Sequence, residues 1–213
     1  MTLVLIDVDG TLLTRKNSEF VFGFDLLRHG ILGKNQIVAY LEFYFKWIKR
    51  FGKTIAKKNK AYLCGLDQDT VAALAERYVQ KRLRQLVRLQ LYERIKNHIR
   101  SGHQTVLLTG TLDCIARPLA EHIGITCVQA SQCATSNGRF TADPPLSHPY
   151  GLEKLHIAKD LATRFNTRLS DCTAYADSNA DLPLLRAVSH PVAVAPDRRL
   201  ARVAKQNGWE IIR

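Results

Sequence analysis

The feature that most constrains the fold is a short apolar segment that runs directly into two acidic residues. Residues 2–6 read Thr-Leu-Val-Leu-Ile, and the segment Asp7-Val8-Asp9-Gly10-Thr11 follows at once. Apolar runs of this length are typical of strands that are buried on both faces, as in parallel sheets. The sequence therefore predicts a first strand that ends in a pair of carboxylates.

The same kind of apolar run recurs along the chain. Further strands are expected at residues 105–108, 173–176 and 191–195, with a weaker one at 210–212. Helical periodicity is found between them, over residues 86–99, 115–122, 152–165 and 198–207. Strands that alternate with helices predict an α/β fold with a doubly wound, Rossmann-like parallel sheet.

Two other segments depart from this alternation. Residues 13–83 are mostly helical in pattern and too long for a loop, so we expect a helical cap inserted into a core of residues 1–12 and 84–213. The sequence Ser136-Asn137-Gly138-Arg139 predicts a hairpin turn between strands at 128–130 and 140–141.

Composition limits the kinds of protein to consider. The chain has 213 residues, 46% of them apolar, and five cysteines without a C-x-x-C pair, which disfavours a disulfide framework or a zinc knuckle. The N-terminus has no basic leader, and the aromatic-rich segment 36–48 is too short to span a bilayer. We expect a cytoplasmic protein.

The net charge is +12, which favours acidic partners. Phosphorylated small molecules, lipid head groups on an anionic membrane and nucleic acid all fit this charge. Nucleic acid is the least favoured, because the chain shows no recognition motif for it. The sequence does not indicate an oligomeric state.

Asp7 and Asp9 lie two positions apart at a strand end, so both side chains begin on the same face. Two carboxylates that approach one site need a shared proton or a cation. A hard divalent ion is the simplest solution, and Mg²⁺ prefers a few carboxylates, waters and phosphate oxygens. The spacing therefore predicts a magnesium site.

Three other segments place polar groups at the same sheet edge. Asp177 and Asp181 follow the strand at 173–176, where they can complete the metal site. Thr109 and Gly110 end the strand at 105–108 and offer a hydroxyl and backbone N–H groups for a phosphoryl oxygen. Lys154, near a helix start, offers a cation for the same oxygens.

Taken in order, these segments resemble the motifs of the haloacid dehalogenase superfamily: D-x-D-x-T, a Ser or Thr, a Lys and a terminal acidic motif. The resemblance is closest to subfamily IB, the phosphoserine phosphatase-like branch with a helical C1-type cap. The segment from Ala174 to Ser178 and the segment Asp181-Leu182-Pro183-Leu184-Leu185 are especially similar to that branch.

The resemblance implies a magnesium-dependent phosphatase and assigns a role to each matching position. Asp7 would attack phosphorus to form an aspartyl-phosphate, and Asp9 would act as general acid and then general base. Thr109, with Gly110 beside it, and Lys154 would hold the phosphoryl group. The metal ligands would be the Asp7 side chain, the Asp9 main-chain carbonyl and the Asp177 side chain, with Asp181 as a supporting residue.

The substrate and the final acceptor stay open. Departures from the branch pattern at Ser178 and Ala180 leave the substrate unassigned between a small, phosphoserine-like metabolite and a lipid phosphate. A phosphotransferase would discharge the same intermediate to an alcohol. A basic module that binds phosphate or membrane without turnover is the alternative from another class.

A basic amphipathic pattern in the predicted cap bears on this choice. On one continuous helix, basic side chains would lie on one side and apolar side chains on the other. The basic residues are Lys46, Lys49, Arg50, Lys53, Lys57 and Lys60, and the apolar residues are Ile37, Leu41, Tyr44, Ile48, Phe51 and Ile55. The plain interpretation is a solvated cap helix. The sharper hypothesis is peripheral contact with an anionic membrane at the inner face, through Phe43, Trp47 and the lysines. Gly52 is a candidate break in this helix.

Overall fold

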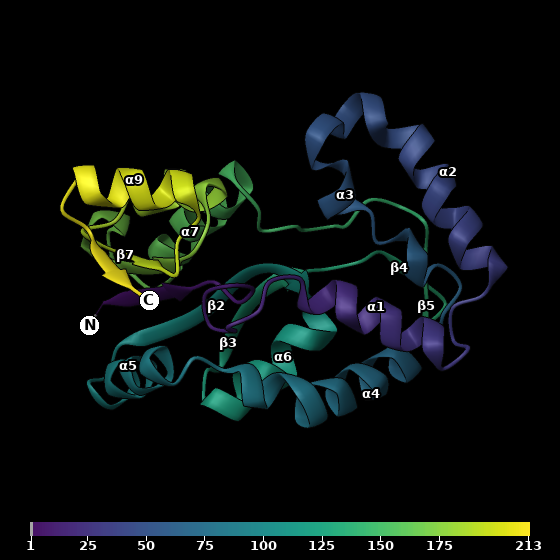
Figure 1. Ribbon diagram of the computed structural model, residues 1–213, viewed down its shortest axis with the longest axis horizontal. Helices are drawn as coiled ribbons and strands as arrows, with labels where there is room; N and C mark the ends of the chain where they lie inside the picture. Colours follow the sequence, from purple (N-terminus) through teal and green to yellow (C-terminus); the bar gives the residue numbers. More distant parts are fainter. Residues whose placement is uncertain (1) are drawn as a thin grey trace.

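A computed structural model describes residues 2–213 and is built around one six-stranded sheet (Figure 1). All strand pairs in this sheet are parallel, in the order β3-β2-β1-β6-β7-β8. The strands are β1 (Leu3–Ile6), β2 (Gln104–Leu112), β3 (Cys127–Ser131), β6 (Thr173–Ala176), β7 (His190–Val194) and β8 (Glu210–Ile212). The α/β prediction of a doubly wound parallel sheet is confirmed.

Helices cover both faces of the sheet, because β1 directs apolar side chains to each. Val4 and Ile6 belong to the cluster under α5 (Leu89–Arg100) and α6 (Asp113–Ile123). Leu3 and Leu5 belong to the cluster under α7 (Leu152–Arg164), α8 (Leu182–Leu185) and α9 (Arg198–Gln206). Figure 1 shows α7 and α9 on one side of the strands and α5 and α6 on the other.

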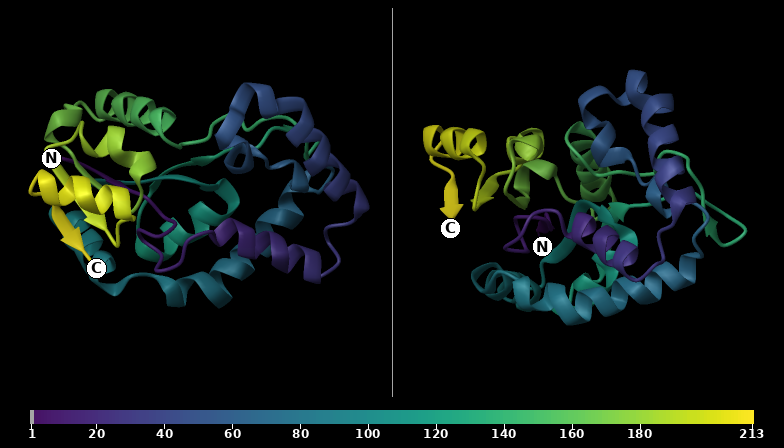
Figure 2. Two further views of the ribbon diagram at one scale, coloured as in Figure 1. Left: turned by 45° about the horizontal axis from the view of Figure 1, so that its top comes forward. Right: turned by 45° about the vertical axis from the view of Figure 1, so that its right-hand side comes forward.

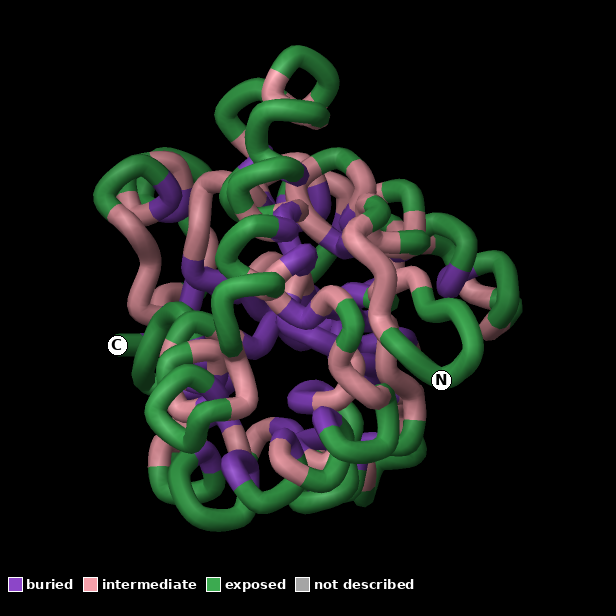
Figure 3. Tube along the Cα trace, turned by 90° about the vertical axis from the view of Figure 1, so that its right-hand side faces the viewer, coloured by how far each residue is buried: buried purple, intermediate pink, exposed green. Residues whose placement is uncertain are grey.

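From β1 the chain adds β2 and β3 on one side of the sheet and then β6, β7 and β8 on the other, so the direction of strand addition reverses at β1. The carboxyl ends of strands beside such a reversal form a crevice, which is the usual ligand site of doubly wound sheets. Figure 3 shows the buried positions concentrated in the centre of the molecule. The ends of β1 and β6 carry Asp7 and Asp177, so the topology brings the predicted carboxylates to that crevice.

The hairpin is at the predicted turn but has a different partner strand. It pairs β4 (Thr135–Ser136) with β5 (Arg139–Phe140), and Asn137 and Gly138 between them both have positive φ. Residues 128–130 instead belong to β3, which extends the main sheet beside β2. The prediction that they form the hairpin was wrong, because a short strand pattern does not specify its partner, and Val128 and Gln129 pair with Leu107 and Leu108 of β2.

Residues 13–83 contain no strand of the main sheet within the described chain, and their helices pack in two ways. The helices are α1 (Ser18–Arg28), α2 (Lys34–Phe51), α3 (Ile55–Lys58) and α4 (Gln68–Tyr78). Phe22 of α1 and Val71 of α4 join the main apolar cluster. Ala39 and Phe43 of α2 form a separate cluster with Ile55 and Ala61. Figure 2 shows α2 and α3 rising from one end of the molecule.

Short 3₁₀ or π segments connect these elements. They lie at Gly52–Thr54, Ala61–Leu63, Val79–Leu83, Arg84–Leu86, Leu169–Asp171 and Asn179–Asp181.

The basic arc does not extend over one continuous helix. Gly52 has φ 48° and ends α2 after Phe51. Lys53, Lys57 and Lys60 therefore lie beyond this helix, in the 3₁₀ segment that follows it, in α3 and just after α3. Lys60 is buried, as is Phe43, and Trp47 is half-buried beside Phe43 and Phe51. The prediction that Phe43 contacts a membrane was therefore wrong, because Phe43 packs with Ile55 of α3 and Ala61. Membrane contact through Trp47 and the exposed lysines stays a prediction.

The solvent-facing apolar residues of α2 lie on its other side. They are Ile37, Val38, Leu41, Tyr44 and Phe45. No helix within residues 2–213 combines the length and the apolar character that crossing a bilayer requires.

Candidate active site

The seven predicted site residues line one cavity of about 990 Å³ at the carboxyl edge of the sheet. They are Asp7, Asp9, Thr109, Gly110, Lys154, Asp177 and Asp181. Residues of α1, α2 and α3 line the opposite wall. The topology therefore brings together groups that lie more than 170 residues apart in the chain.

Lys154 is the central cation of the site. Its Nζ donates to Asp7 Oδ1 at 2.8 Å and to Asp181 Oδ2 at 2.9 Å, and all three residues are buried. Burial opposes the charged form of Lys154, but the two carboxylates outweigh it and raise the lysine pKa. Burial also raises the pKa of Asp181 to about 6, although Lys154 acts in the other direction. The single positive charge of Lys154 therefore compensates only part of the negative charge of the two carboxylates.

Asp7 is oriented by a second contact. Thr11 Oγ1 donates to Asp7 Oδ2 at 3.1 Å, and the Asp7 N–H donates to the Tyr175 carbonyl at 3.1 Å. The first contact explains the threonine of the D-x-D-x-T motif, and the second ties the end of β1 to β6. Both carboxylate oxygens of Asp7 are held in place and keep lone pairs on the cavity side.

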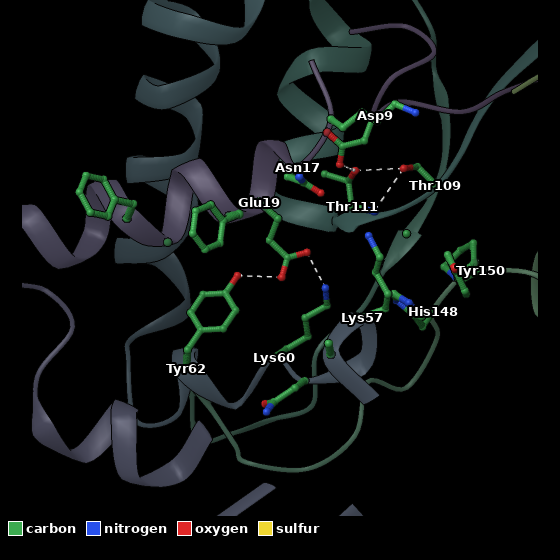
Figure 4. Close-up of a pocket in the computed structure, with 18 of the residues that line it drawn as sticks. Asp9, Asn17, Glu19, Lys57, Lys60, Tyr62, Thr109, Thr111, His148 and Tyr150 are labelled. Atoms are coloured by element: carbon green, nitrogen blue, oxygen red, sulfur yellow. Dashed lines mark hydrogen bonds and ion pairs between the residues drawn. The ribbon is translucent and has the colours of Figure 1, made fainter. Parts of the chain in front are cut away.

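Asp9 lies in the loop after β1, where its carboxylate bridges the start of α1 and β2 (Figure 4). Asp9 Oδ1 accepts from the Ser18 N–H at 2.8 Å, and Oδ2 accepts from Thr111 Oγ1 at 3.0 Å. Burial raises the Asp9 pKa, and nearby Asp7 adds to the rise, while the hydrogen bonds from Ser18 and Thr111 oppose it. A carboxyl group with a raised pKa is suited to proton transfer near neutral pH.

Thr109 and Gly110 lie in an irregularity of β2. The register of β2 with β3 shifts between Leu108 and Leu112, which turns the intervening residues towards the cavity. Thr109 Oγ1 donates to Thr111 Oγ1 at 3.0 Å, so the hydroxyls form a chain that ends on Asp9 (Figure 4). A Cβ on Gly110 would lie 3.3 Å from His148 Cε1, so little room remains for a side chain.

Asp177 already attracts a cation. Lys16 Nζ lies 2.6 Å from Asp177 Oδ2, although half of the lysine side chain is exposed. Burial raises the pKa of Asp177, and the neighbouring Asp7 adds to the rise, while Lys16 lowers it. Gly10 has φ 85°, and a Cβ there would lie only 2.4 Å from Asp177 Oδ2. A glycine is therefore required for the first loop to approach this carboxylate.

Magnesium fits this donor set. Asp7, Asp177 and Asp181 are buried acids near one another, and Lys16 and Lys154 supply fewer positive charges than these acids carry. Within residues 2–213, no three His, Cys, Asp or Glu side chains form a ready-made metal cluster. The predicted ligands, two carboxylates and the Asp9 main-chain carbonyl, would suit an ion that retains waters and binds substrate phosphate.

Sequence reasoning missed two residues that shape this site. Asp197 Oδ2 accepts from the Asn179 N–H at 2.7 Å, and its own N–H donates to the Asp177 carbonyl at 2.8 Å. Asp197 thereby holds the loop that carries Asp177. Lys16 was also missed. The only sequence signal for Asp197 was an acidic residue before a predicted helix, which by itself indicates a cap.

His148 also lines the cavity, and its tautomer follows from its neighbours. Ser131 Oγ donates to the Gly110 carbonyl at 2.7 Å and lies 2.6 Å from His148 Nδ1. Since the hydroxyl proton is used, Nδ1 must be the donor and Nε2 an unprotonated acceptor. Burial and the nearby Lys60 lower the His148 pKa to about 3. Buried Nε2 has no partner among the described residues, so it can accept a hydrogen bond from a substrate.

On the opposite wall, Glu19 is neutralised by its neighbours (Figure 4). Lys60 Nζ lies 2.5 Å from Glu19 Oε2, and Tyr62 Oη donates to Glu19 Oε1 at 2.9 Å. Burial and the Glu19 charge raise the pKa of Tyr62, so its hydroxyl stays protonated. Both Glu19 oxygens therefore have a partner inside the protein.

Comparison with known proteins agrees with this geometry. Residues 4–186 match the family described as haloacid dehalogenase-like hydrolase. The chain is 29% identical to phosphoserine phosphatase SerB1 of Mycobacterium tuberculosis over 96% of this chain and 68% of that protein. It is 28% identical to a histidinol-phosphatase of Neisseria meningitidis over 99% of this chain and 97% of that protein.

A solved structure has the same fold. A protein of unknown function from Bordetella pertussis superposes with a TM-score of 0.83 and 23% identity, covering 100% of this chain and 99% of the other. The predicted resemblance and the prediction of a hydrolase of this fold are confirmed. The names of the relatives agree with the prediction of a phosphatase.

Proposed function

We propose that this chain, which belongs to the haloacid dehalogenase-like hydrolase family, is a magnesium-dependent phosphatase that uses Asp7 as its nucleophile. The observation that carries the proposal is the buried Asp7–Lys154–Asp181 arrangement with Asp9 beside it. It combines a fixed carboxylate, a cation and a carboxyl group with a raised pKa in one cavity. Phosphoryl transfer depends mainly on such positioning and charge neutralisation.

In the first step, a carboxylate oxygen of Asp7 bonds to phosphorus while the bond from phosphorus to the ester oxygen breaks. Protonated Asp9 gives its proton to the departing oxygen, which leaves as an alcohol. Lys154 and the backbone at Gly110 orient the phosphoryl oxygens, together with the Thr109 hydroxyl once it turns from Thr111 towards the substrate. Lys154 keeps its charge in this role because its pKa is raised.

In the second step, Asp9 is a carboxylate and takes a proton from water. The water oxygen bonds to phosphorus and the bond to Asp7 breaks, which restores the Asp7 carboxylate and releases inorganic phosphate. Magnesium, held by the Asp7 and Asp177 side chains and the Asp9 carbonyl, would neutralise charge on the phosphoryl group. Asp181 would support the site by sharing Lys154 with Asp7.

The substrate is a phosphorylated small molecule or a lipid phosphate. The relatives named phosphoserine phosphatase and histidinol-phosphatase support the first choice. The apolar residues that line part of the cavity support the second.

We would measure magnesium-dependent phosphate release from phosphoserine, histidinol phosphate, sugar phosphates and lysophosphatidate. Asp7→Asn should lower kcat roughly 10⁴-fold or more, as expected for loss of a covalent nucleophile. The matched control is Asp171→Asn, which removes an exposed carboxylate paired with Arg168 far from the nucleophile in the chain. Equal activity of wild type and Asp7→Asn would exclude Asp7 as the nucleophile.

Two readouts separate the alternatives. An acid quench followed by mass spectrometry should find phosphate on the peptide that contains Asp7. Added alcohols should not appear as new phosphate esters; if they do, the protein is a phosphotransferase. Folded protein that binds phosphate esters but releases no phosphate would instead be a binding module.

A further inference from the structure

The cavity extends well beyond the space that a phosphate group needs. One end is formed by the buried carboxylates and Lys154, and the other by the cavity-facing sides of α1 and α2. The side chains at this second end are apolar, and we call this part of the cavity the apolar trough. It is lined by Phe20, Phe24, Leu27, Leu32, Ile37 and Tyr40.

The trough exposes large side chains to solvent to an unusual degree. Phe20 is 77% exposed, Phe24 53% and Leu27 47%, and their i, i+4, i+7 spacing places them on one stripe of α1. Ile37, 54% exposed, begins the facing stripe on α2. An exposed apolar patch of this kind commonly marks a binding site.

The apolar trough is part of the same cavity as the catalytic carboxylates, which indicates what occupies it. A group bonded to a phosphate at Asp7 can extend along α1 without leaving the cavity. Phe20 follows Glu19 directly and lies within four residues of Asn17, which also lines the cavity. The natural occupant is therefore the non-phosphate part of the substrate.

The polar groups of the opposite wall indicate the charge of that substrate. A substrate ammonium group would need an unpaired carboxylate, but Lys60 and Tyr62 already occupy both oxygens of Glu19. Lys57 also lines the cavity and makes no ion pair with any residue in 2–213. Because both Glu19 oxygens are paired and Lys57 forms no ion pair within the described chain, the cavity favours an anionic substrate with an apolar body over one that carries an ammonium group.

We propose that the physiological substrate is an amphiphilic phosphomonoester whose single hydrocarbon chain lies in the apolar trough between α1 and α2. This inference rests on the proposed phosphatase function and specifies its substrate class. The phosphate binds at Asp7 and Lys154, and the chain packs against Phe20, Phe24 and Ile37. Burial of the chain contributes binding free energy that phosphoserine, which has no such chain, lacks.

A series of n-alkyl phosphates, from butyl to dodecyl, tests the inference below the critical micelle concentration of each ester. A methylene group that is completely removed from water raises affinity roughly fourfold. Because the trough is open on one side, each methylene of the substrate stays partly in water, and we expect kcat/KM to rise about twofold per methylene. The gain should level off once the chain is longer than the trough. A kcat/KM that is flat from butyl to dodecyl would overturn the inference.

Matched variants locate the effect. Phe24→Ser should reduce the ratio of kcat/KM for decyl and butyl phosphate towards one. Leu89→Ser is the control, because Leu89 is 72% exposed on α5 and does not line the cavity. It should keep the wild-type ratio and activity. An equal loss in both variants would mean that alkyl chains adsorb without a specific site and would contradict the proposal.

The remaining outcomes are distinguishable. If no ester of any length is hydrolysed by folded protein, the phosphatase proposal itself fails. If butyl phosphate is hydrolysed without any gain for longer chains, only the amphiphile inference fails.

Sedimentation of wild type and Phe24→Ser tests whether a second copy of the protein covers the trough. A dimer that is lost in the variant, together with a kcat/KM that does not depend on chain length, would show that the trough binds a second copy and not a substrate chain. Decyl phosphate presented in phosphatidylcholine vesicles, compared with monomeric decyl phosphate, shows whether the chain is taken from a bilayer or from solution.

Discussion

At the scale of single residues, the site depends on how Lys154 is shared. It donates to Asp7 and Asp181 at nearly equal distances, so neither carboxylate has the cation to itself. The remaining negative charge is available to attract a divalent ion, and Asp177 attracts Lys16 for the same reason. A buried, incompletely balanced group of acids is costly for stability but useful for binding a metal and a phosphate.

Gly10 is the residue at which backbone geometry most directly limits this site. We predict that Gly10→Ala lowers kcat roughly 10²-fold, because the new Cβ would displace the Asp177 carboxylate. It should also lower the free energy of unfolding by about 1–2 kcal/mol through the positive φ. Urea denaturation and phosphate-release assays measure the two effects.

Gly102→Ala is the matched control for this variant. Gly102 also has a positive φ, 73°, but a Cβ there would meet nothing within 4 Å. It should show the loss of stability with normal activity. If both variants are equally active, close contact with Asp177 is not what requires glycine at position 10.

At the scale of elements, helix caps do more than end helices. Asp197 accepts from the N–H groups of Arg199 and Leu200 at the start of α9, and its other oxygen accepts from Asn179 in the loop after β6. These hydrogen bonds lower the Asp197 pKa although burial opposes the shift. A capping residue thus links α9 to the loop that carries Asp177.

Replacing this cap should therefore affect both stability and activity. We predict that Asp197→Ala lowers the free energy of unfolding by about 1 kcal/mol, as for an ordinary N-cap. It should also weaken magnesium binding, measured by calorimetry, because the Asp177 loop loses its anchor at Asn179. Asp67→Ala is the control, since Asp67 caps α4 through Thr70 and does not line the cavity. A similar loss of magnesium affinity in both variants would show that only general destabilisation is involved.

At the scale of the whole molecule, the chain has separate apolar clusters rather than one continuous core. Phe22 of α1 packs into the main cluster beneath the sheet, whereas Phe43 of α2 packs only with the small cluster around Ile55 and Ala61. Figures 2 and 3 show α2 and α3 projecting from the rest, with mostly exposed positions. We infer that this segment can open while the sheet stays folded.

Hydrogen exchange with matched Phe→Ala variants tests this inference. Each deletion should cost about 3–5 kcal/mol, but in different places. Phe43→Ala should speed exchange in α2 and α3 and leave β1, β2 and β6 protected. Phe22→Ala should lower protection throughout the sheet. Uniform acceleration in both variants would indicate one cooperative unit.

The amino-acid order by itself determined the parallel α/β sheet and the residues that meet at its carboxyl edge. This was possible because apolar runs such as residues 2–6 are local signals, and because parallel strands end at one common edge. The order Asp7, Thr109, Lys154, Asp177 was sufficient to predict a site. Their catalytic roles remain predictions that follow from the resemblance.

Only the tertiary structure decided which side chains are paired, free or exposed. Residues 128–130 joined the main sheet because strand pairing depends on long-range packing. Phe43 was buried and Phe20 exposed although both lie on amphipathic helices, because the partner of a helix face is not encoded in its periodicity. The neutralisation of Glu19 by Lys60 and the anchor from Asp197 to Asn179 also join residues distant in sequence. Such contacts depend on three-dimensional position, which no local pattern specifies.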